Sequence, residues 1–197
     1  QLIKVGDYTP PVVTCPVVLN PWGVAMNPVT FSTSPFDCAA SFEVPLPQVS
    51  DVCSPSWTTT IEIVTDVQVP VLNQYGQQIG TTVQTEVIRR ILPGASRFVT
   101  GIPIGEHRFS YIVTDECGNT AIKECEFRVI DLIEPSAICS DQLNVSLNGA
   151  GTARVFATSV NEGSYDNCAL ARLEVRRSID RNADCAPAAE TFSAWGV

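Results

Sequence analysis

The stretch Cys125-Glu126-Phe127-Arg128-Val129 decides the fold class of this 197-residue chain. Apolar and charged residues alternate along it. Successive side chains of a β-strand point to opposite faces, so a period of two predicts a strand with one buried face and one face in water. Phe109–Val113, just upstream, has the same alternation, with Ile112 as an apolar exception.

Working outward, Ile61–Ile63 and Leu173–Val175 repeat this alternation, and no window shows a helical stripe. Turn residues separate the runs at Asn73–Gly76, Leu92–Gly94, Pro103–Gly105, Cys117–Asn119 and Asn148–Gly149. The last of these is typical of a hairpin, because a type I′ turn needs positive φ. Many short strands between such turns predict an all-β protein built from immunoglobulin-like β-sandwiches.

The sequence also repeats itself. Val5–Cys15 matches Val129–Cys139 at a constant offset of 124 residues, and Ser50–Cys53 corresponds to Tyr165–Cys168 at a shorter spacing. A repeat of this length indicates a tandem array. We expect residues 1–9 to be the last strand or linker of a preceding module, 10–132 to be a complete β-sandwich, and 133–197 to be the start of an incomplete second one.

The cysteines point to an oxidising compartment. The chain has eight of them, no Cys-x-x-Cys pair and a single histidine, His107, so clustered zinc ligands are missing and disulfides are the better use of the thiols. We therefore expect an extracellular protein on the cell surface.

Charge and proline exclude two classes of partner. The net charge of −9 would repel a nucleic-acid phosphate backbone. Residues 8–36 carry no charge but contain repeated prolines, so they are not a membrane helix, and we do not expect the chain to be embedded in a membrane.

Residues 102–119, followed by Cys125–Asp131, resemble the hyalin-repeat (HYR) pattern. In that pattern Gly and Tyr precede Asp-x-x-Gly-Asn, and Cys-x-Phe-x-Val and an Asp follow. The second module, from Val145 to Arg177, resembles HYR-related repeats of giant surface proteins that Bacteroidota export by type IX secretion and that are associated with adhesion or gliding motility. The resemblance covers roughly residues 8–197 and implies an extracellular, non-catalytic immunoglobulin-like module.

The resemblance implies a disulfide between Cys15 and Cys125. Cys53 and Cys117, each beside an aspartate, are the next pair that we expect, and Cys168 with Cys185 is a third. Cys38 and Cys139 are left over, and an alternative such as Cys15 with Cys38 stays open.

Acidic and amide side chains gather near module ends and strand junctions. Calcium prefers such oxygen ligands. The alternative is that they cap turns through local hydrogen bonds. The calcium candidates are Asp51, Asp115, Asn119, Asp131 and Asp166.

A catalytic role is not expected. His107 lies on a predicted strand near an apolar face, and no nucleophile-elbow, zinc-protease or phosphate-loop motif occurs. The chain is therefore expected not to be an enzyme.

The favoured function is a structural repeat of a bacterial surface stalk, fibre or filament, with self-association or neighbouring modules as its partners. Strand donation between chains is one form that such association could take. The alternatives are an adhesive module that recognises a surface glycan or protein, through Val67–Ser96 for example, and an accessory domain of a secreted hydrolase.

Overall fold

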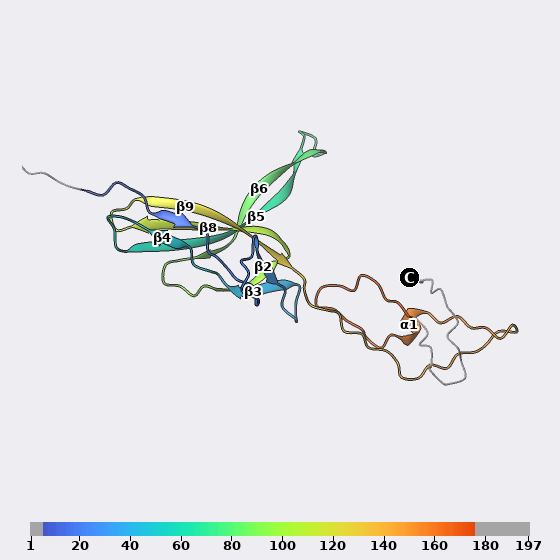
Figure 1. The fold of residues 1–197 in the computed structure, drawn as a ribbon. Helices are drawn as coiled ribbons and strands as arrows, with labels where there is room; N and C mark the ends of the chain where they lie inside the picture. The colour runs from blue at the N-terminus through green and yellow to red at the C-terminus, as the bar shows by residue number, and fades with distance from the viewer. Residues whose placement is uncertain (1–5, 176–197) are drawn as a thin grey trace, which may run out of the picture. The chain divides into compact units, whose positions relative to one another are not determined.

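We describe residues 6–175 of a computed structural model of the chain (Figure 1). The chain divides into two compact units, Gln1–Leu132 and Ile133–Val197. The division falls between Asp131 and Pro135, at the junction where the sequence repeat begins again. Each unit is described by itself.

All the strands of the described residues lie in the first unit. They are β1 Val12–Thr14, β2 Val29–Ser32, β3 Ala39–Glu43, β4 Gln48–Ser50, β5 Trp57–Leu72, β6 Gln78–Ile91, β7 Phe98–Pro103, β8 Gly105–Asp115 and β9 Thr120–Ile130. The prediction of an all-β protein is confirmed, since the only helix in the described part of the chain, α1 Ala157–Val160, is four residues long.

The strands form one large sheet and two small ones. The large sheet has the order β2-β9-β8-β5-β6, in which β2 runs parallel to β9 and the other neighbours are antiparallel. The small sheets pair β1 with β4 and β3 with β7. The region before β1, residues 6–9, carries no strand.

The core lies between the large sheet and the β3–β7 sheet. Phe42 of β3 lies edge-on to Phe109 of β8 and Phe127 of β9, and those two rings stack at 4.0 Å between centroids. Buried residues from both sheets form a single hydrophobic cluster. The alternation of Cys125–Val129 is confirmed, because its apolar residues are buried and the two charged ones between them are exposed.

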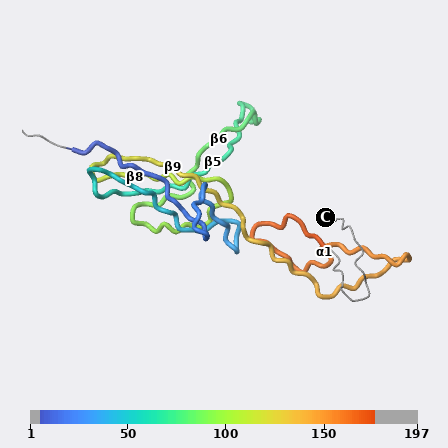
Figure 2. The backbone as a smooth tube through the Cα atoms, in the orientation of Figure 1, coloured from blue at the N-terminus to red at the C-terminus, as the bar shows by residue number. Residues whose placement is uncertain are grey.

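Strands β5 and β6 extend beyond the rest of the large sheet. The pairing of β5 with β8 ends at Thr65 opposite His107, whereas its pairing with β6 continues to Leu72. Residues 66–85 therefore form a two-stranded ribbon, here named the arm, which projects from the module (Figures 1 and 2). Its tip is the expected turn, where Gly76 takes a φ of 77°.

The second unit differs from the prediction of strands. In the described part of this unit there are isolated bridges, Ser136 with Tyr165 and Cys139 with Asn161, but no strand. Leu173–Val175 is not a strand, because it pairs with no other segment in the described residues and alternation alone cannot supply a partner. The turn at Asn148 is present, but the positive φ of 74° falls on Gly151 and not on Gly149. The Asn148 side chain accepts hydrogen bonds from the backbone N–H groups of Ala150 and Thr152, which fixes a different turn.

Candidate functional site

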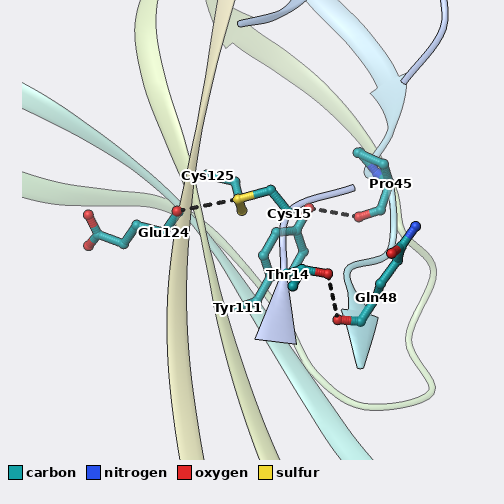
Figure 3. The surroundings of a disulfide bond; sticks show 7 residues. All are labelled: Thr14, Cys15, Pro45, Gln48, Tyr111, Glu124 and Cys125. Carbon is teal, nitrogen blue, oxygen red and sulfur yellow. Dashed lines mark hydrogen bonds between the residues drawn. A yellow bond between two sulfur atoms is a disulfide. The ribbon is translucent and has the colours of Figure 1, made fainter. Parts of the chain in front are cut away.

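A disulfide joins the two ends of the first module. Cys15, directly after β1, is bonded to Cys125 of β9, with their Cα atoms 5.7 Å apart and a sequence separation of 110 (Figure 3). This is the pair that the resemblance implied. The bond ties the small β1–β4 sheet to a strand in the interior of the large sheet.

Hydrogen bonds lie around the Cys15–Cys125 disulfide (Figure 3). The Thr14 hydroxyl donates to the Gln48 carbonyl across the β1–β4 sheet, at 3.4 Å. The fully buried Tyr111 hydroxyl donates to the Pro45 carbonyl at 2.8 Å, and burial raises the pKa of that phenol. A buried polar group that is hydrogen-bonded avoids a desolvation cost, so this contact holds the segment before β4 against β8.

Three carboxylates converge at one end of the same module. Oxygen atoms of Asp7, Asp51 and Asp115 lie within 4.8 Å of one another. The Asp51 Oδ1 atom accepts the backbone N–H groups of Cys53 and Ser54, at 2.9 and 2.7 Å. The Ser54 hydroxyl in turn donates to Asp7 Oδ2 at 3.3 Å.

Asn119 connects two of these aspartates. Its side-chain amide donates to Asp115 Oδ2 at 2.8 Å and to the Asp7 backbone carbonyl at 3.2 Å. Asp115 is only 6% exposed. Burial pushes its pKa upward, but hydrogen bonds from the Asn119 side chain and from the backbone N–H groups of residues 117–119 outweigh burial, so the pKa of Asp115 is lowered.

The cluster has the chemistry of a calcium site and also of a capped turn. Calcium binds oxygen ligands at about 2.3–2.6 Å, so two ligand atoms of one ion lie at most about 5 Å apart, and the three carboxylates meet that condition. The structure brings Asp51, Asp115 and Asn119 together, as the sequence suggested, and adds Asp7. Sequence reasoning left Asp7 out of the calcium set, although the repeat aligns it with Asp131, a candidate.

Of the other two candidates, Asp131 makes a hydrogen bond to a residue distant in sequence and Asp166 makes local ones. Asp131 Oδ1 accepts the Thr33 hydroxyl at 2.9 Å. Asp166 Oδ1 accepts the backbone N–H groups of Cys168 and Ala169, at 2.8 and 3.1 Å. This is the same turn that Asp51 makes, so the two copies of the Asp-x-Cys motif share a local structure as well as a sequence.

The expected disulfide between Cys53 and Cys117 is wrong for this structure, in which both are exposed free thiols. Disulfide formation proceeds through a thiolate. The Asp7 carboxylate, burial, the Asp51 carboxylate and Cys117 all raise the pKa of the Cys53 thiol. The carboxylates beside this thiol therefore disfavour the form that would react.

Cys38 is disulfide-bonded, although the sequence left it without a partner. Cys168 is also disulfide-bonded. Cys185, its expected partner, lies outside the described residues. Cys139 is an exposed free thiol.

His107 is a structural residue of β8. It is 4% exposed, its Nε2 atom lies 2.8 Å from the Pro103 carbonyl oxygen, and its ring lies 5.3 Å from that of Phe127. With Nε2 donating to that carbonyl, the imidazole is used to hold the turn between β7 and β8.

Comparison with known proteins found no family model, no curated protein and no solved structure that matches this chain. The part of the chain that the structure describes contains no helix with the length and apolar character of a membrane span.

Proposed function

We propose that this chain is a non-catalytic structural repeat of an extracellular bacterial stalk, fibre or filament, in tandem immunoglobulin-like modules related to hyalin repeats. The observation that carries the proposal is the disulfide between Cys15 and Cys125. It closes most of the first module into one covalent loop of 110 residues.

Such a bond changes what happens when the chain is pulled. An unfolded segment extends by about 3.5 Å per residue, so a 110-residue loop would release about 380 Å of chain under load. With the disulfide closed, tension passes from Cys15 to Cys125 through the sulfur atoms and the loop is bypassed. A module of this kind keeps its length when its noncovalent structure gives way, which suits a stalk that holds something at a distance.

Two further features support the proposal. The Asp-x-Cys turn recurs at Asp51 and Asp166 with the same backbone partners, as expected of tandem modules. Disulfides persist outside the reducing cytosol, which favours a secreted, cell-surface location.

Single-molecule stretching of the 197-residue chain, held at its two ends, tests this proposal. We expect the Cys38→Ala chain, in its oxidised form, to lack a lengthening step of about 38 nm that a variant with Cys15, Cys38 and Cys125 all replaced by alanine shows. Cys38 lies inside the loop and is itself disulfide-bonded, so only the triple variant can extend the whole loop. A reagent that reduces disulfides should restore the step in the wild-type chain. The proposal fails if the oxidised Cys38→Ala chain lengthens as far as the triple variant does.

An adhesive module is the second candidate, and the projecting arm favours it, because a binding loop must reach beyond the body that holds it. Saturable binding of a surface glycan or protein, abolished by substitutions in the arm and unaffected by those near the disulfide, would establish this candidate instead.

A further inference from the structure

The two long edges of the arm are unlike each other. Beyond Thr65, β5 has no neighbour among the described residues on the side away from β6, and this stretch of β5 contains the charged Asp66 and also Pro70, which has no N–H to donate. Charge and proline are devices by which proteins protect exposed strand edges. The β5 edge is therefore closed to a further strand.

The β6 edge lacks that protection. β6 is the last strand of the large sheet, so its outer side has no partner within the described residues. From Gln78 to Thr85 it contains neither a charged residue nor a proline. Its protection begins only near the module body, where Glu86, the register shift beside Val87 and the two arginines follow.

Apolar side chains stand exposed along this edge strand. Ile79 is 67% exposed, Val83 64% and Val87 49%, at intervals of four residues. An isolated two-stranded ribbon is marginally stable in water, and an added strand would stabilise it. The arm thus presents unpaired backbone groups together with apolar surface.

The sequence of β6 is complementary to itself. An antiparallel pairing of two copies about Val83 sets Thr81 against Thr85 and Ile79 against Val87 of the other copy. Threonine–threonine and apolar β-branched pairs are favourable cross-strand neighbours. Glu86 falls opposite Gly80, so no like charges meet.

The absence of charge on the arm favours it as the surface at which two copies of the chain meet. Chains that each carry a net charge of −9 repel one another over most of their surface. Residues 67–85 contain no charged residue, so the arm can approach another arm without that repulsion. A two-fold interface also requires a patch that matches itself, which this register provides.

We propose that the outer edge of β6 pairs, antiparallel and centred on Val83, with the same edge of a second copy of this chain, joining neighbouring stalks or fibres side by side. This inference rests on the proposed structural function and names its partner.

The test places like charges on the two-fold axis in each variant alone and opposite charges there in a mixture of the two variants. Sedimentation equilibrium of the 197-residue chain, with free thiols alkylated beforehand, should show a reversible dimer for the wild type. Val83→Lys and Val83→Glu should each weaken the dimer by about tenfold, because two like charges then meet at the axis. An equal mixture of the two variants should recover dimerisation, since lysine then faces glutamate. Val71→Lys, on β5 of the same arm, is the matched control and should dimerise as the wild type does.

A monomeric wild type would overturn the inference. So would a dimer that Val83→Lys leaves unchanged, or a mixture of the two variants that stays monomeric. Loss of glycan binding in Val83→Lys without any dimer in the wild type would assign the arm to adhesion instead. The stretching experiment uses one molecule at a time, so its outcome is independent of dimerisation and the two proposals fail separately.

Discussion

Replacing both Cys15 and Cys125 with alanine should remove about 5 kcal/mol from the stability of the first module. In the chain-entropy description, a cross-link between residues 110 apart restricts the unfolded chain by that amount at 25 °C. Stabilities of domains are only about 5–15 kcal/mol, so this one bond accounts for a large share. Alanine is the suitable replacement because Cys125 is buried and a serine hydroxyl would need a partner there.

Urea unfolding followed by far-ultraviolet circular dichroism is the suitable assay. In the described residues the strands belong to the first unit, so the β-sheet signal reports that unit. Two changes are expected in the variant: a lower midpoint, and a steeper dependence on urea, because the unfolded chain without the cross-link exposes more surface.

Chemical reduction of the wild-type chain cannot replace the double alanine variant, because it would also break the disulfides of Cys38 and Cys168. The double alanine variant isolates one bond. A loss of stability below about 1 kcal/mol, with no change in the urea dependence, would refute the reasoning, because the unfolded chain would then gain little freedom when the loop opens.

Other parts of the structure give further predictions. Tyr111→Phe should cost about 1.5 kcal/mol in urea unfolding, because the half-buried Pro45 carbonyl loses its hydrogen bond; no measurable cost would contradict that contact. The folded pKa of Asp66 is lowered to about 2 by hydrogen bonds from Arg108 and Thr85, so its contribution is complete above about pH 4 and is lost as the pH falls through about 2. Thermal unfolding of Asp66→Asn should therefore vary less between pH 4 and 2 than that of the wild type, and equal slopes would rule this out. Alkylation of Cys53, followed by mass spectrometry at pH 8, should be faster in Asp51→Asn, because one of the carboxylates that raise its pKa is gone; an unchanged rate would remove that electrostatic explanation. Calcium binding at the cluster of Asp7, Asp51 and Asp115 stays a prediction. Added calcium should raise the melting temperature of the wild type but not of Asp51→Asn, and equal responses would contradict calcium binding there.

The sequence predicted parts of three strands of the first module, β5, β8 and β9, because their alternation and their burial have the same cause. β9 has one face in the core and one in water, and along β8 fully buried residues mostly alternate with partly buried ones, so the period of two was visible. The same reasoning failed at Leu173–Val175, where the residues alternate but the described chain offers no strand beside them. Alternation predicts that one face of a segment can be buried, but it does not predict which segment packs against that face.

The cluster of Asp7, Asp51 and Asp115 was predictable only in part. Asp51 and Asp115 attract notice because each lies beside a cysteine, whereas Asp7 lies in a linker and is brought to them by contacts between residues distant in sequence, with Ser54 and Asn119. The raised pKa of the Cys53 thiol depends on the Asp7 carboxylate, on burial and on the Asp51 carboxylate. Neither the position of Asp7 beside the other two aspartates nor the pKa of Cys53 can be predicted from spacing along the sequence.

The position of β9 in the large sheet sets how the module would yield. β9 is the strand from which the chain continues into the second unit, and it has β2 on one side and β8 on the other. Without the Cys15–Cys125 bond, a pull along the axis of β9 would slide it between both neighbours, and because ladder hydrogen bonds run across the strands, many would have to rupture at once instead of opening one after another. With the bond closed, a load that arrives at Cys15 passes to Cys125, and only the part of β9 that follows Cys125 carries it.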